Sequence, residues 1–188
     1  MFLTTAQIPD EFIYNGEKFS LVGLKGKDLP TPEDFGIKPY SRCTACWRGY
    51  VMKYTFTNDR LILDGMLVNT KNPPKINGVE PRTGKDTGNS LFEYCYKNLD
   101  LKTEFTGNVL LAKDFIQQMY VHMGFQRSMA FKTVVEIQVE KGNIIGIGNL
   151  SKKMEEERIE DIYKGAQPRS NSDEDIESWV NKTFSLDY

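Results

Sequence analysis

The sequence predicts an α+β fold: a strongly curved, mainly antiparallel sheet or partly open barrel, with one short crossing helix and two C-terminal helices. Three observations support this class: apolar residues alternate in several segments, turn dipeptides separate these segments, and the sequence becomes acidic and helix-like near its end. We expect residues 1–150 to form a strand-rich core domain with a long loop at 69–90. Residues 151–188 should form an acidic helical extension that packs on or beside this core.

The composition is that of one soluble domain. The chain has 188 residues, of which 39% are hydrophobic, and it contains no apolar run long enough to span a membrane. Its start lacks the basic and apolar regions of a secretory signal, and three cysteines cannot form a disulfide framework, so we expect a cytoplasmic protein. A net charge of −2 argues against nucleic acid or a membrane as partner.

The first element is a hairpin over residues 11–24. Its turn is Asn15-Gly16, a dipeptide that accepts the positive φ angles of a type I′ turn, and this register places Phe12 opposite Phe19. The following segment, 25–41, contains three prolines and is predicted to be a connecting loop.

The best-specified element is a second hairpin over residues 47–68, with its turn at Asn58-Asp59. The expected register pairs Thr57 with Arg60, Phe56 with Leu61, Tyr54 with Leu63, Lys53 with Asp64, and Tyr50 with Leu67. One face of this hairpin is then apolar and should face the core: Tyr50, Met52, Tyr54, Phe56, Leu61, Leu63 and Leu67.

Residues 69–90 contain three prolines and three glycines, and a loop of this length is usually mobile or functional. The segments 91–99 and 104–112 alternate and are predicted strands. Asp114 is a plausible N-cap and Gly124 a plausible C′ residue for the short helix that should cross the sheet.

The last predicted hairpin covers residues 133–147 and turns near Lys141-Gly142. Ser151 and Ser172 then stand at N-cap positions ahead of segments with acidic first turns, which favours two helices. The final 38 residues hold six basic and ten acidic groups, a local net charge of −4, whereas the first 150 hold 18 basic and 16 acidic groups.

Cys43 and Cys46 form one Cys-x-x-Cys motif, which here leads into a strand rather than a helix and so does not resemble a disulfide oxidoreductase. Cys43, Cys46, Cys95 and His122 would together complete a Cys₃His zinc site, an alternative that needs a turn between the first two cysteines. The simpler interpretation is partly buried thiols, no metal and no cofactor.

His122 is the only histidine, so any reaction that needs an imidazole must use it. A Cys46–His122 pair is the candidate catalytic set of a small hydrolase or transferase. The structural alternative is a histidine that caps carbonyl groups in the last turn of the short helix.

Arg48 falls on the same face as Tyr50 and Met52 unless Gly49 forms a bulge. A guanidinium on a core face needs a partner, because burying an unpaired charge is costly. The partner is a carboxylate, in a structural ion pair, or several carbonyl groups, or a bound anion, in which case Arg48 anchors a ligand. If Gly49 forms a bulge, Arg48 faces solvent instead.

Four segments resemble a group of small bacterial proteins of unknown function: Thr44-Ala-Cys-Trp-Arg-Gly-Tyr50, Arg60-Leu-Ile-Leu63, Phe105-Thr-Gly-Asn-Val-Leu-Leu111 and Tyr120-Val-His-Met-Gly124. The resemblance covers about residues 12 to 148 and implies a family without implying an activity. Compared with shorter members, this chain carries the insertion at 69–90 and the acidic extension.

No phosphate-binding loop, nucleophile elbow or metalloprotease helix occurs in the chain. We therefore expect a binding or interaction domain that recognises a protein or a small anionic ligand near Arg48. A Cys/His enzyme, a structural zinc domain, and a partner-binding protein that uses its acidic tail are the alternatives. The expected ligand-binding residues are Trp47, Arg48, Tyr50, Tyr120 and His122.

Overall fold

The computed structural model describes residues 5–27, 29–122, 124–164, 172–175 and 177. Nine strands lie within this part of the chain: β1 (Glu11–Tyr14), β2 (Glu17–Lys27), β3 (Tyr50–Thr57), β4 (Arg60–Val68), β5 (Arg82–Thr83), β6 (Tyr94–Lys102), β7 (Thr106–Phe115), β8 (Phe131–Glu140) and β9 (Asn143–Asn149). One longer α-helix, α1 (Ser151–Lys164), follows β9, and short 3₁₀ turns occupy Pro32–Phe35, Lys85–Thr87, Gln117–Met119 and Ser128–Ala130.

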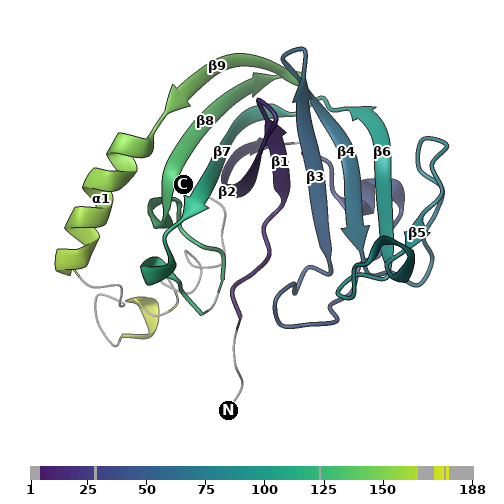
Figure 1. Cartoon of the computed structure of the whole chain (residues 1–188), viewed down its shortest axis with the longest axis horizontal. Coiled ribbons are helices and arrows are strands. Elements are labelled where there is room, and N and C mark those ends of the chain that lie inside the picture. Colours follow the sequence, from purple (N-terminus) through teal and green to yellow (C-terminus); the bar gives the residue numbers. More distant parts are fainter. Residues whose placement is uncertain (1–4, 28, 123, 165–171, 176, 178–188) are drawn as a thin grey trace.

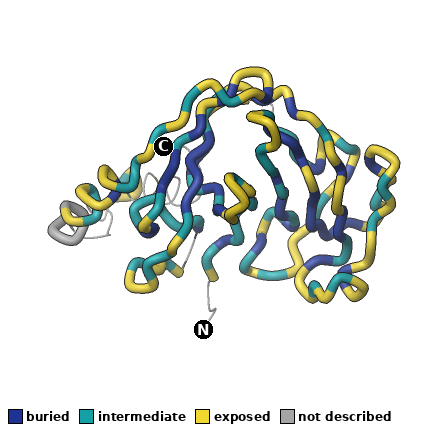
Figure 2. Tube along the Cα trace, turned by 45° about the horizontal axis from the view of Figure 1, so that its top comes forward, coloured by how far each residue is buried: buried dark blue, intermediate teal, exposed yellow. Residues whose placement is uncertain are grey.

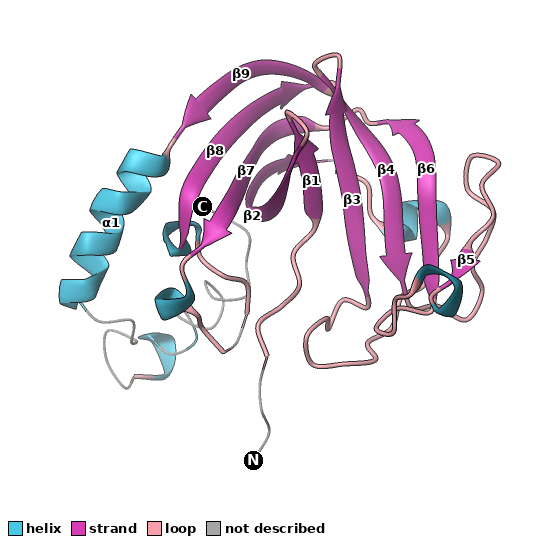
Figure 3. Ribbon diagram, viewed as in Figure 1, coloured by secondary structure: helices cyan, strands magenta, loops and turns pink. Residues whose placement is uncertain are grey.

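The strands form one sheet in the order β3-β1-β2-β7-β8-β9-β4-β6-β5, and an additional β3–β4 pairing closes seven of them into a mixed barrel (Figure 1). The expected curved sheet is confirmed, but the ring of strands is closed rather than open, and a single residue pair, Arg60 with Asn143, joins β4 to β9. Figure 3 shows these strands in magenta. The sheet is also not wholly antiparallel, since β1 and β3 pair in parallel. The chain between β2 and β3 crosses to the side of β1 that β2 does not occupy. There β3 becomes a parallel neighbour of β1.

The barrel interior is filled with side chains. Its largest fully buried members include Tyr54, Tyr96, Phe12 and Phe105. In Figure 2 the dark blue of buried residues runs along the strands, whereas the turns and the helix are mostly yellow. The barrel therefore serves as the hydrophobic core of the domain.

Both predicted turns of the N-terminal half are confirmed, with Phe12 opposite Phe19 and Thr57 opposite Arg60. Beyond Tyr54–Leu63 the predicted β3–β4 register is wrong by one residue. Lys53 lies opposite Gly65, and Asp64 is the extra residue of a β-bulge.

Two residues favour the bulge. The charged Asp64 stays exposed because of it, and Gly65, which has no Cβ, fits a position where a Cβ would lie 2.6 Å from the Tyr96 carbonyl oxygen. As a result Met66 and Val68 enter the barrel core, while Leu67 faces a separate cluster outside it. The expected placement of Leu67 in the core face was wrong for this reason.

The predicted crossing helix is also wrong. Asp114 belongs to β7, with a φ of 63°, and its carboxylate accepts a hydrogen bond from Thr133 Oγ1 at 2.8 Å. β7 continues to Phe115, which pairs with Phe131 at a ring-centroid distance of 5.2 Å. This cross-strand aromatic pair favours the strand over a helix start, and only a three-residue 3₁₀ turn follows.

Two buried tyrosines fasten the proline-containing loops to the barrel. Tyr54 Oη donates to the Pro30 carbonyl oxygen and Tyr96 Oη to that of Pro74, each at 2.6 Å. The loop at 69–90 is thus attached to the core, and it contains β5 and one 3₁₀ turn.

The first C-terminal helix is confirmed as α1. Met154 is buried against β7 and β8, and the Arg158 guanidinium donates to the carbonyl oxygens of Met129 and Phe131 at 2.7 and 2.9 Å. The second predicted helix, near 173–183, lies mostly outside the described residues. No helix in the described part of the chain has the length and apolar character needed to cross a membrane.

Candidate functional site

The segment before β1 joins the two loops that carry the resemblance motifs. Backbone amides of Gln7 and Ile8 donate to the carbonyl oxygens of Gly124 and Ala45, each at 2.8 Å. The Gln7 side chain donates from Nε2 to the Thr44 carbonyl oxygen at 2.8 Å and accepts the backbone amide of Trp47 at 2.9 Å. One short segment therefore holds the loop 41–49 beside residues 120–122 and 124–126.

Arg48 pairs with Asp10 in a bidentate ion pair. Nη1 and Nη2 lie 3.0 Å from Oδ2 and Oδ1 of Asp10, and Nη2 also donates to the Ile8 carbonyl oxygen at 3.3 Å. The guanidinium lies over the rings of Tyr50 and Phe125, at 4.7 and 5.3 Å from their centroids. The structural alternative for Arg48, a carboxylate partner, is the one present.

Arg48 itself lies in the turn before β3 and not within the strand, so its expected place on the strand was wrong. Gly49 ends this turn with a φ of 75° and forms no strand bulge. Asp10 also accepts the Met52 backbone amide at 2.8 Å, so this buried carboxylate connects the N-terminal segment to β3.

The ion pair determines the electrostatics of the site. Burial lowers the pKa of the Arg48 guanidinium, but the adjacent Asp10 carboxylate outweighs this effect and the net pKa is raised. Arg48 is therefore charged at all physiological pH values, and Asp10 neutralises that charge directly. Little of it is left to attract a second anion.

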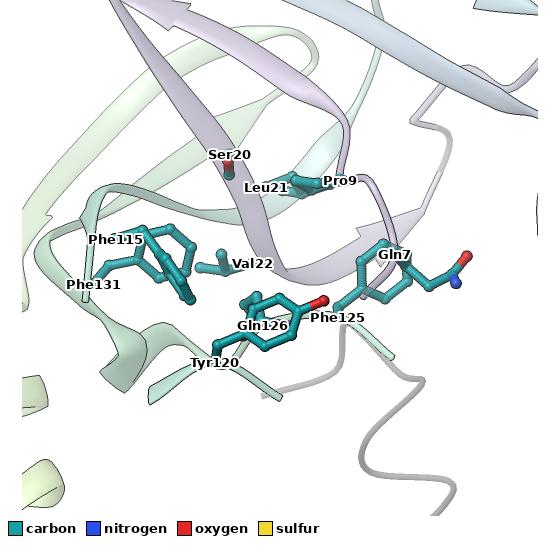
Figure 4. Close-up of a pocket in the computed structure, with 10 residues that line it drawn as sticks. All are labelled: Gln7, Pro9, Ser20, Leu21, Val22, Phe115, Tyr120, Phe125, Gln126 and Phe131. Atoms are coloured by element: carbon teal, nitrogen blue, oxygen red, sulfur yellow. The ribbon is translucent and has the colours of Figure 1, made fainter. Parts of the chain in front are cut away.

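A pocket of about 220 Å³ opens beside the ion pair, and its lining is mainly apolar. Phe125 belongs both to this pocket and to the ring stack on Arg48. Figure 4 shows Tyr120 and Phe125 on one side of the pocket and the Phe115 and Phe131 rings at another. The complete lining is Gln7, Pro9, Ser20, Leu21, Val22, Phe115, Tyr120, Phe125, Gln126 and Phe131.

Three polar side chains of the pocket, those of Gln7, Tyr120 and Gln126, form hydrogen bonds within the protein. Gln126 accepts the Val121 amide and donates to the Val121 carbonyl oxygen, at 3.1 and 2.9 Å. The Tyr120 hydroxyl accepts the Ala6 amide at 3.2 Å. The lining is therefore held in place before any ligand arrives.

Two aromatic side chains of this region are exposed. Tyr120 is 40% exposed and Trp47 is 48% exposed. His122 is exposed as well, and its ring meets the Tyr120 ring edge-on at 5.1 Å. It lies in a loop and does not cap a helix, which corrects the structural expectation for it.

The structure thus distributes the five predicted ligand-binding residues around one region. Tyr120 lines the pocket, with the His122 ring against it, and Trp47 donates its amide to Gln7. The Arg48 guanidinium lies over the rings of Tyr50 and Phe125. Sequence reasoning missed Gln7, Asp10 and Phe125. An acidic residue directly before an apolar strand was the one available signal for Asp10.

Cys46 and His122 are directed to different neighbours. The Cys46 thiol is buried and donates to the Tyr50 carbonyl oxygen at 3.2 Å, whereas the His122 ring contacts Tyr120. Burial raises the pKa of the Cys46 thiol, which disfavours the thiolate that a nucleophile requires.

A turn does lie between Cys43 and Cys46, since the Cys46 amide donates to the Cys43 carbonyl oxygen at 3.3 Å. Cys46 and Cys95 share a buried cluster, and Cys43 packs against it as a free thiol. His122 is not part of that cluster. Among the described residues, no group of three or more His, Cys, Asp or Glu side chains could hold a metal ion.

Comparisons of the chain with protein-family models, with curated proteins and with solved structures found no match. The resemblance to small bacterial proteins stays a prediction. Function must therefore be argued from the geometry of the site.

Proposed function

We propose that this protein is a binding domain whose apolar pocket receives one hydrophobic side chain of a protein partner. The observation that carries the proposal is the pocket itself, a recess of about 220 Å³ walled by aromatic rings on a rigid barrel. Ligand pockets for small molecules usually occupy roughly 300–1,000 Å³, so this one suits a single side chain better than a whole metabolite.

The surroundings of the pocket support a protein partner. Exposed Tyr and Trp side chains are enriched at the centres of protein interfaces, and Tyr120 stands at the pocket while Trp47 is tied through its amide to Gln7. The hydrogen bonds of Gln7, Gln126 and Tyr120 keep the lining in place, which reduces the entropy lost on binding.

An apolar anchor is favoured here over the anionic one expected from sequence. The two guanidinium nitrogens that face Asp10 already have carboxylate partners, and Arg48 does not line the pocket but packs against Phe125, which does. Arg48 and Asp10 then act as the support that positions Phe125. The same proposal holds that the protein is bacterial and cytoplasmic and that it binds neither nucleic acid nor a membrane.

Selection of peptides from a displayed random library would test this function. Peptides enriched on the wild-type protein should share one aromatic or aliphatic anchor and should shift the amide NMR signals of the pocket residues. Val22→Phe, which fills the pocket from β2, should abolish their binding, and Ile13→Phe, a change at an exposed position on β1, should leave it intact. Peptides that bind Val22→Phe as tightly as wild type would refute the proposal.

A second pocket favours a second candidate function, binding of a small organic anion. It measures about 490 Å³ and is formed by residues 36–40 and 70–72, with Lys38 and Lys71 in its lining. Neither lysine forms an ion pair with any described residue. Thr70, which also lines the pocket, is 3% exposed. Calorimetric titration with phenyl phosphate should detect binding that the double substitution Lys38→Met and Lys71→Met removes; equal heats for both proteins would exclude it.

A further inference from the structure

The strand β9 has one free edge. β4 pairs with β9 only through Arg60 and Asn143, because from Ile62 to Val68 the same side of β4 is occupied by β6. Within the described part of the chain, β9 beyond its first residues is therefore paired on the β8 side alone. Figure 1 shows the consequence, with β9 arching away from β4 toward α1.

The direction of the backbone groups on this edge follows from the hydrogen bonds at both ends of β9. The Leu150 amide donates to Val134 of β8, so the alternate residues Asn149 and Ile147 direct their N–H and C=O groups to the other side. The Ile144 amide also points that way, since it donates to the Asp59 carbonyl oxygen. Among the residues that the structure describes, the backbone donors and acceptors of Ile147 and Asn149 are thus unpaired.

The side chains of this strand are unusual for an edge. Ile145 and Ile147 are 62% and 55% exposed, the two highest values among the large hydrophobic side chains of the described residues. The strand reads Asn-Ile-Ile-Gly-Ile-Gly-Asn, with no charge and no proline. Natural edge strands normally carry lysine or proline, which prevent pairing, and β9 carries neither. Its one β-bulge lies at Ile145, so the stretch from Gly146 to Asn149 pairs with β8 in regular register.

We propose that β9 is a dimerisation strand that pairs antiparallel with β9 of a second copy of this chain. Antiparallel pairing about a two-fold axis at Gly148 sets Ile147 of each copy opposite Asn149 of the other, so that outward-facing donors meet outward-facing acceptors. A Cβ at Gly148 would meet no described atom within 4 Å, so the sheet face next to the axis position is open. The barrel of one copy then continues into that of the next.

A second copy fits this edge better than a foreign peptide does. The strand is uncharged, so two identical edges meet without repulsion and no charged peptide is selected. An isologous contact satisfies both free edges at once and closes the assembly, whereas a bound peptide would satisfy one. No residue of β9 lines the apolar pocket, so dimerisation is independent of the proposed binding function.

Sedimentation velocity of the full chain tests the proposal. The wild-type protein should move from 21.6 kDa toward twice this mass as its concentration rises through the micromolar range. Ile147→Lys places on this edge a lysine, which natural edge strands use to prevent pairing, and should raise the dimer dissociation constant at least roughly tenfold. The matched control Ile13→Lys alters an exposed isoleucine on β1, a strand paired on both sides, and should dimerise as wild type does.

Amide hydrogen exchange provides the second measurement. Exchange at Ile147 and Asn149 should slow as protein concentration rises, and Ile147→Lys should remove this dependence while its circular dichroism matches wild type. A wild-type protein that stays monomeric at high concentration overturns the proposal. So does a dimer that Ile147→Lys leaves intact, because its interface would lie elsewhere.

Discussion

Removal of the Asp10 carboxylate tests how the candidate site is held together. Asp10 is 5% exposed and accepts three hydrogen bonds, two from Arg48 and one from the Met52 amide. In Asp10→Ala the guanidinium loses its counter-ion, and a backbone amide at the start of the barrel loses its acceptor. Both groups remain in a largely desolvated position.

The expected cost follows from these contacts. Breaking a buried ion pair from one side costs about 3–5 kcal/mol, and the Arg48 side chain is 24% exposed, so water recovers part of this and the lower end applies. We predict that Asp10→Ala lowers the free energy of unfolding by about 3 kcal/mol. Asp10→Asn keeps an acceptor for the Met52 amide and should cost about half as much.

Urea denaturation followed by circular dichroism measures both values. The double substitution Asp10→Ala with Arg48→Met removes the stranded charge, and it should be at least about 1 kcal/mol more stable than Asp10→Ala alone. An Asp10→Ala cost below about 1 kcal/mol would show that the pair is a solvated contact without structural weight. A double variant no more stable than the single one would show that the guanidinium is not the source of the loss.

Three further predictions concern other parts of the molecule. Burial raises the pKa of Tyr96 to about 12, above the ordinary value of about 10. The protonated phenol of Tyr96 therefore contributes its full share of the free energy of unfolding below pH 10, and this share is lost as the pH rises toward 12. Tyr96→Phe should reduce this alkaline loss of stability in denaturation curves. The raised pKa of the buried Cys46 thiol predicts that iodoacetamide alkylates Cys43 first near pH 8, and mass spectrometry of a digest showing faster labelling of Cys46 would contradict the burial argument. Gly49→Ala should destabilise the protein by more than about 2 kcal/mol, because a Cβ there would lie 2.2 Å from a backbone carbonyl oxygen, whereas Gly16→Ala, at a similar φ but in open space, should cost only about 1 kcal/mol in thermal or chemical melts.

Local sequence determined the hairpins of this protein. Asn15-Gly16, Asn58-Asp59 and Lys141-Gly142 all stand at the tight turns that they predict, because positive φ angles are accessible to very few residue types. The alternation of apolar residues likewise placed most of the barrel core. Each of these signals is contained within about ten neighbouring residues.

Tertiary structure decided the rest, since the remaining choices depend on residues far apart in the chain. The bulge at Asp64 exists because Gly65 approaches β6, and β7 extends through Asp114 because Phe115 meets Phe131 on β8. On a core face Arg48 needed a partner, but Asp10 lies 38 residues away in the sequence, and the parallel pairing of β1 with β3 brings the two together. Barrel closure is a property of all seven strands together, and no short segment encodes it.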